Sequence, residues 1–313
     1  MSALTRGSPP RWLLWAFAAA LNLIWAASYP ISKLVMTGVP PLGLTAWMTV
    51  VSTLVLLPLA RGFPAGWTKD AAWIAVMGAV GLAAASALQF LGTARTAAAN
   101  VSLIVGLEPL AVALMASVLI KESLTPRSAA AFLLALAGVA LITVDPSSLE
   151  MRGRLEGNLM VLASVLCYAV YTVGGRVLAA RWEPCTLTML SFAAAAVVFV
   201  PAYALLDPAG MKRSLSLTWS EAAGIAFLTV FAAAVGYAGW NWLLKWVTAG
   251  ELSFSIYLQP VAGAALSWWI LGEPLSGTFF AGTALVLGAV ALESARPAAP
   301  RPPRARGYRS GGE

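Results

Sequence analysis

The segment Asn100–Leu124, NVSLIVGLEPLAVALMASVLIKESL, carries an acidic residue deep inside an apolar run. The run extends over residues 97–120, which is long enough for one transmembrane helix at ~20 residues per bilayer crossing. Glu108 lies near its middle and Pro109 follows directly. A carboxyl group at this depth and a residue without a backbone donor are both costly in a bilayer. We therefore expect neighbouring helices to accommodate them.

The same order of residues recurs in the second half of the chain at a constant spacing. Glu108-Pro109 corresponds to Gln259-Pro260, and Glu122 corresponds to Glu273. Matches of Pro and Glu are informative in a chain that is rich in Ala and Leu, so the pattern indicates an internal duplication. Glu122 and Glu273 would end equivalent helices on opposite membrane faces, where we expect them to cap or anchor the loops.

The composition indicates a polytopic membrane protein. The chain is 60% apolar and 11% charged, with a mean hydropathy of +0.81, whereas about 25% of the residues of a globular protein are charged. The expected fold class is therefore all-α and integral to the membrane, with ten transmembrane helices. Their expected segments are 12–36, 41–60, 71–93, 97–120, 128–144, 157–178, 185–206, 220–244, 251–271 and 277–294.

The duplication divides these helices into two repeats, 12–144 and 157–294, joined by a linker at 145–156 and followed by a basic tail at 295–313 that we expect to be disordered. Two copies of a five-helix unit must enter the membrane from opposite sides, so the repeats are expected to be inverted. The distribution of Lys and Arg favours cytoplasmic termini. Small residues on the fifth and tenth helices predict close packing at the periphery or in a homodimer.

Several classes of function find little support in the sequence. The chain has no histidine, and its aspartates lie in loops or at helix ends, which argues against histidine-based catalysis and the commonest metal sites. No nucleotide-binding motif is present. We expect no cofactor and no metal. The net charge of +7 is spread over loops and the tail, so no nucleic-acid partner is expected.

Glu108 is the strongest candidate for a functional residue. A surrounding of low dielectric constant favours the protonated form of a carboxyl group, so Glu108 could bind a proton and a cationic substrate in alternation. Intramembrane acids are commonly functional. The alternative is a structural glutamic acid that is hydrogen-bonded to a neighbouring helix.

Aromatic and polar residues share faces of the other helices at helical spacing. An aromatic box with one carboxylate suits an organic cation or a metabolite that bears an amine, although ordinary packing between helices explains any single aromatic residue. The candidate binding residues beside Glu108 are Asn22, Trp25, Tyr29, Gln89, Tyr168, Tyr171, Tyr237, Asn241, Tyr257 and Gln259.

Each repeat opens with an aromatic-Ala pair followed by a basic residue and ends with a proline followed by Glu-x-Leu. These motifs are Trp25-Ala26…Lys33, Tyr168-Ala169…Arg176, Pro109…Glu122-Ser123-Leu124 and Pro260…Glu273-Pro274-Leu275. With them, both repeats resemble the EamA-type branch of the drug/metabolite transporter superfamily. The resemblance covers about 12–294.

The resemblance implies a ten-helix carrier of the bacterial inner membrane with both termini in the cytoplasm. Such carriers commonly export amino acids, other metabolites or toxic compounds, and their cavity is lined mainly by helices one, three, four, six, eight and nine. We predict a secondary transporter of a small molecule that works by alternating access, with exchange for protons as one option. The alternatives are a polytopic membrane enzyme or lipid-handling scaffold, and a pore.

Overall fold

The computed structural model describes residues 9–64, 66–119, 121, 126–143, 151–178, 181–247, 252, 255–256 and 258–294. Within these ranges the regular structure is helical, without strands. The expected residues Glu122 and Tyr257 and the tail 295–313 lie outside the described residues.

The first half contains five helical segments in the expected places. The first segment is α1 (Arg11–Val35), and the second is α2 (Pro41–Leu56) with the short η1 (Leu57–Leu59). The third is a continuous run of η2 (Trp67–Asp70), α3 (Ala71–Gly78), η3 (Ala79–Ala84) and α4 (Ala85–Thr93). The fourth is the pair α5 (Ala98–Val105) and α6 (Glu108–Leu119), and the fifth is α7 (Pro126–Thr143). Proline begins α2 and α7, where its missing N–H costs no helical hydrogen bond.

The second half repeats this order. It consists of α8 (Met151–Leu178), α9 (Pro184–Leu206), the short α10 (Pro208–Ser214), the chain of α11 (Trp219–Ala226), η4 (Phe227–Val235) and α12 (Gly236–Leu243), α14 (Leu258–Leu271) and α15 (Gly277–Ser294). Helix α8 starts inside the segment 145–156 that we expected to be a linker. A capping box between Thr218 and Glu221 fixes the start of α11.

The helices confirm the all-α membrane class. Six of them are long and apolar enough to cross a bilayer, and the bent pair α5–α6 would be a seventh. The other apolar helices among the described residues are shorter. Ten crossings therefore remain a prediction.

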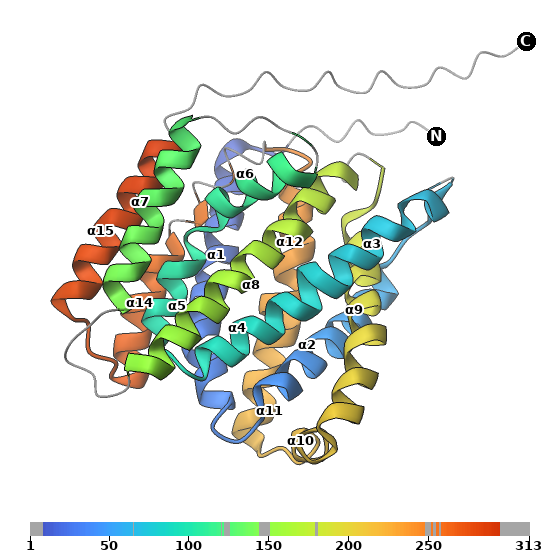
Figure 1. Cartoon of the computed structure of the whole chain (residues 1–313). Helices are drawn as coiled ribbons and strands as arrows, with labels where there is room; N and C mark the ends of the chain where they lie inside the picture. The colour runs from blue at the N-terminus through green and yellow to red at the C-terminus, as the bar shows by residue number, and fades with distance from the viewer. Residues whose placement is uncertain are drawn as a thin grey trace, which may run out of the picture.

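The packing of the helices is reciprocal between the two halves (Figure 1). Helix α1 packs against α11, η4, α12 and α14 of the second half, while α8 packs against α3, η3, α4, α5 and α6 of the first half. Helices α2 and α9 pair with each other, and α7 pairs with α15 at one edge of the bundle. Equivalent helices of the two halves therefore exchange partners across the bundle.

Equivalent helices also share a local distortion. The third segment of each half contains a π-helical stretch, η3 in the first and η4 in the second. A π-helical stretch displaces backbone carbonyls from the regular α-helical pattern, and such stretches are frequent at functional sites. Both stretches lie in helices that face the centre of the bundle.

Candidate functional site

The chain breaks in the middle of the segment that contains Glu108. Helix α5 ends at Val105 and α6 begins at Glu108, and the two axes differ by 46°. Pro109 explains why regular α-helix does not continue through this point. Gly106 allows a close approach of α14, because a Cβ atom at this position would lie 2.8 Å from Cγ of Pro260. Glu108 thus occupies the N-terminal end of α6, where the helix dipole favours a negative charge.

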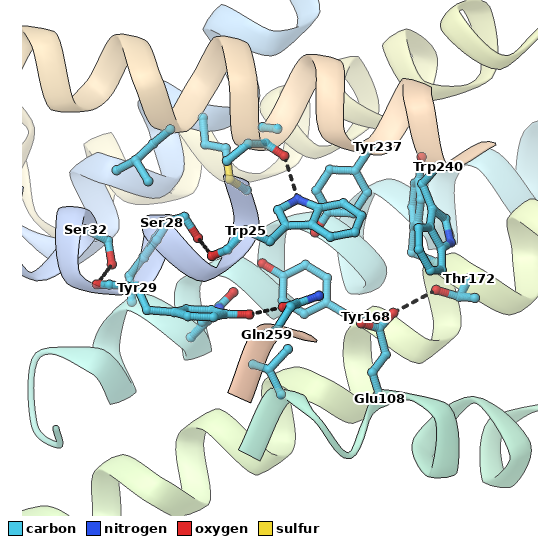
Figure 2. Close-up of a pocket in the computed structure, with 18 residues that line it drawn as sticks. Trp25, Ser28, Tyr29, Ser32, Glu108, Tyr168, Thr172, Tyr237, Trp240 and Gln259 are labelled. Carbon is cyan, nitrogen blue, oxygen red and sulfur yellow. Dashed lines mark hydrogen bonds between the residues drawn. The ribbon is translucent and has the colours of Figure 1, made fainter. Parts of the chain in front are cut away.

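Glu108 faces an internal cavity between the two halves of the bundle (Figure 2). The cavity volume is about 80 Å³, enough for several water molecules, because each needs only ~10–15 Å³ in this measure. The residues that line it are Trp25, Ser28, Tyr29, Ser32, Met48, Gln89, Phe90, Val105, Glu108, Tyr168, Tyr171, Thr172, Leu228, Ala232, Ala233, Tyr237, Trp240 and Gln259. Helices of both halves therefore surround one small central space.

The lining comes from the helices that the family resemblance implied. Helix α1, the chain ending in α4, the pair α5–α6, α8, the chain of η4 and α12, and α14 all contribute. Helix α2 adds Met48. Helices α7 and α15 supply none of the described lining residues, in keeping with their place at the edge of the bundle.

The carboxyl group of Glu108 is held by one hydrogen bond from a described side chain. The hydroxyl of Thr172 donates to Oε1 of Glu108 over 3.2 Å, and Figure 2 shows the carboxyl group directed toward Thr172 beside the ring of Tyr168. A hydroxyl can donate to a carboxylate and accept from a carboxylic acid. Thr172 can therefore hold Glu108 in both protonation states.

The equivalent residue of the second half is held more firmly. Gln259 is buried, its carbonyl oxygen accepts a hydrogen bond from the hydroxyl of Tyr29, and its amide donates to Oδ1 of Asn22 over 2.7 Å. The amide of Asn22 donates in turn to Oγ of Ser255 over 2.9 Å. This network ties α14 to α1. The two halves therefore use the equivalent positions differently, with a tethered amide in one and a lightly held carboxyl group in the other.

Aromatic rings enclose the space beside Glu108. Trp25 packs against Tyr237 at a centroid distance of 5.9 Å and against Trp240 at 5.5 Å. Tyr237 also contacts Tyr168 at 6.2 Å and Tyr171 at 5.2 Å. These five residues, which we call the aromatic box, come from α1, α8 and the chain of η4 and α12.

One backbone carbonyl fixes the orientation of Trp25. Its indole N–H donates to the carbonyl oxygen of Ala232 over 2.8 Å, within the π-helical stretch η4. Gly236 makes room for the ring, since a Cβ atom there would lie 2.7 Å from Nε1 of Trp25. The distortion of η4 and the lack of a side chain at Gly236 together set the position of this wall of the cavity.

The structure brings together most of the residues predicted for the site. Those that line the cavity are Trp25, Tyr29, Gln89, Glu108, Tyr168, Tyr171, Tyr237 and Gln259. Asn22 and Asn241 do not line it. Asn22 is committed to the network with Gln259, and the amide of Asn241 donates to the hydroxyls of Tyr171 and Thr188 over 2.9 Å each. They support lining residues from behind.

Several lining residues were absent from the predicted set. Ser28 lies three residues after Trp25 and Ser32 three residues after Tyr29 along α1, so the face of Trp25 and Tyr29 could have indicated them. Their hydroxyls donate to backbone carbonyls of α1, from Ser28 to Trp25 and from Ser32 to Tyr29. The apolar lining residues, such as Met48, carry no signal that distinguishes them from packing residues.

A second polar cluster lies just beyond the cavity at the C-terminal end of α1. The ammonium group of Lys33 forms an ion pair with Glu273 at 2.7 Å and also donates to the carbonyl oxygen of Thr96. The Glu273 carboxylate accepts backbone N–H groups of Ala98 and Ala99 at 3.0 and 3.1 Å. Glu273 therefore caps the N-terminal end of α5 and ties it to α1. From the sequence we expected this residue to cap or anchor a loop. We call Lys33, Thr96, Ala98, Ala99 and Glu273 the Lys33 cluster.

Comparison with known proteins agrees with this architecture. The model of the EamA-like transporter family matches residues 10–144 and again residues 155–294. The chain belongs to the EamA-like transporter family. The family and its relatives indicate a transporter of the drug/metabolite class and not an enzyme.

Individual relatives are similar over most of their length. An "Uncharacterized transporter YyaM" of Bacillus subtilis (strain 168) is 26% identical over 274 residues, which cover 85% of this chain and 88% of the relative. A "Probable terminal-alkyne amino-acid exporter" of Streptantibioticus cattleyicolor is 25% identical over 287 residues, which cover 90% of this chain and 93% of that one. A solved structure titled "Crystal structure of protein" has the same fold, with a TM-score of 0.61, 22% identity and coverage of 90% of this chain and 95% of the other.

Proposed function

We propose that this multi-pass membrane protein exports a small metabolite, such as an amino acid or an organic cation, in exchange for protons. Its two halves would rock about the central cavity, so that the site faces each side of the membrane in turn. The bacterial inner membrane, cytoplasmic termini and a homodimer formed through α7 and α15 belong to the same proposal.

The observation that carries the proposal is the difference between Glu108 and Gln259. At equivalent positions of the two halves, Gln259 is held by Asn22 and Tyr29, whereas Glu108 faces the cavity with one described side-chain partner. A purely structural role would favour a residue as fully bonded as Gln259. Glu108 is instead free to exchange its proton for a cation. Competition between the two for one carboxylate couples their movements in opposite directions.

Transport by the purified protein in proteoliposomes tests this proposal. A panel of amino acids and organic cations is offered under an imposed pH gradient to the wild type, to Glu108→Gln and to Glu156→Gln, a matched change at an exposed residue outside the cavity. We expect the gradient to drive substrate uptake by the wild type and the Glu156 variant and to have no effect on Glu108→Gln. Uptake by Glu108→Gln that still follows the gradient would overturn the role of Glu108.

The double variant Glu108→Gln/Gln259→Glu adds a second control. It retains the net charge of the chain but moves the carboxyl group to the other half. Since Asn22 and Tyr29 occupy the side-chain atoms of residue 259, we expect no return of coupling. Restored coupling would show that any carboxyl group between the halves suffices.

A further inference from the structure

We propose that the substrate is an organic cation without a carboxylate, that is, an amine or alkylated ammonium ion joined to an apolar body. This inference rests on the proposed function, and it separates the amine from the amino acid as the transported species. It is carried by the charges of the cavity, by the arrangement of the aromatic box and by the hydrogen bonds of the remaining lining groups.

The charges of the cavity favour a cation. Among the described lining residues Glu108 is the sole Asp, Glu, Lys or Arg, and the chain contains no histidine. Lys33 of α1 follows the lining residue Ser32, and its ammonium group is engaged by Glu273 and by a backbone carbonyl. An ammonium group entering the cavity therefore meets an opposite charge. A carboxylate meets no cationic side chain and is repelled by ionised Glu108.

The aromatic box provides a second feature that selects cations. The faces of Trp and Tyr rings carry negative electrostatic potential and attract ammonium groups within about 6 Å of the ring centre. The ring of Trp25 contacts those of Tyr237 and Trp240, so these three rings are already positioned beside the space that Glu108 faces. The hydrogen bond from Trp25 to Ala232 holds one wall in place. Binding therefore loses little side-chain entropy in arranging these rings.

Several other polar groups of the lining are already engaged in hydrogen bonds and give a carboxylate little compensation. Tyr29 donates to Gln259, Ser28 and Ser32 donate to backbone carbonyls, and the amide of Gln259 donates to Asn22. A dehydrated carboxylate would have to break these bonds or depend on neutral donors alone. Burial of an unpaired charge costs far more than burial of a neutral group. The zwitterionic form of an amino acid is therefore at a disadvantage to its matched amine.

Matched pairs of compounds test the inference directly. Exchange in proteoliposomes is measured for phenethylamine against phenylalanine, tyramine against tyrosine and choline against glycine betaine, because each pair differs chiefly in the carboxylate. We expect the amine or alkylammonium member to be transported at least ~10-fold more efficiently, since one unfavourable interaction of ~1.4 kcal/mol already produces this ratio. Equal efficiency within the pairs would overturn the inference, and so would preferred transport of the carboxylate-bearing members.

Two variants at Tyr237 separate the role of the rings from folding. Tyr237→Phe retains the ring and Tyr237→Leu removes it. We expect Tyr237→Phe to retain most of the preference, and Tyr237→Leu to weaken binding of the ammonium compound by ~3- to 30-fold, as expected for one cation–π contact. Similar behaviour of the two variants would contradict the role of the aromatic box.

The outcomes also distinguish failure of this inference from failure of the proposed function. Proton-coupled transport of amino acids, dependent on Glu108, would preserve the transporter mechanism and reject the substrate class. Absence of transport for both members of every pair, together with no response of the protein to a pH gradient, would reject both.

Discussion

Replacement of Glu273 with glutamine removes the charge that holds three segments together at one end of the cavity. Glu273 accepts hydrogen bonds from Lys33 of α1 and from the first two residues of α5, and it lies two residues after the end of α14. Ser32, which precedes Lys33, lines the cavity. We therefore expect the Lys33 cluster to close this end, so that opening of the cavity toward the same membrane face would break its contacts.

The structure sets the size of the expected effect. Hydrogen bonds to charged groups contribute ~1.5–3 kcal/mol each, and Glu273 accepts three such bonds from Lys33, Ala98 and Ala99. Glutamine retains one carbonyl oxygen, and the side chain of Lys33 is 33% exposed whereas that of Glu273 is 12% exposed. We therefore expect a loss of ~2–4 kcal/mol, less than the sum, because solvent screens the exposed partner.

Two measurements detect this loss. Thermal unfolding of the purified protein in detergent should shift down by roughly 3–6 °C, at ~1.5 °C per kcal/mol for a chain of this length. In a background without Cys167 and Cys185, a cysteine at Ser32 should react faster with a membrane-impermeant thiol reagent when Glu273→Gln is added. A melting temperature and a reaction rate equal to those of the parent would refute the view that this cluster closes the cavity.

Two further changes test close contacts of the site. Gly81→Ala places a Cβ atom 2.7 Å from Cβ of Tyr171, so it should lower stability by ~1–3 kcal/mol through overpacking. Gly288→Ala is the matched control, because the nearest neighbour of its Cβ atom would lie at 3.9 Å. This variant should melt no lower than the wild type. Gly236→Ala creates a contact with Trp25 as close as that of Gly81→Ala with Tyr171, at 2.7 Å, so it should lower the melting temperature by a similar amount and also reduce substrate transport by the folded protein. Transport equal to the wild type would show that the position of this ring is unimportant.

The sequence predicted the helical class and most of the lining because both depend on short-range patterns. Apolar runs of membrane length identify helices wherever they lie, and the match of Glu108-Pro109 with Gln259-Pro260 identified the duplication. Pro109 also indicated a disturbed helix, although neither the bend of 46° nor the close approach of Gly106 to Pro260 could be read from it. The π-helical stretches have no such signal, since ordinary apolar residues form them.

The division between lining residues and supporting residues could not be predicted in the same way. Helical spacing places Asn22 on the same face of α1 as Trp25 and Tyr29, but the side chain of Asn22 turns toward Gln259 and Ser255 of another segment. Asn241 is likewise directed to Tyr171 and Thr188. Which polar residue faces the cavity depends on the rotation and distance of the neighbouring helices, and these are long-range properties.

Coupling of proton movement to substrate movement through Glu108 is tested most directly by imposing a substrate gradient and measuring the movement of protons. Proteoliposomes that contain a pH-sensitive dye and no initial pH gradient are given a gradient of the transported compound. For the wild type we predict that protons leave as substrate enters, so that the internal pH rises. For Glu108→Gln we predict no change of internal pH. Substrate entry without proton movement in the wild type, or unchanged proton movement in Glu108→Gln, would contradict the exchange mechanism.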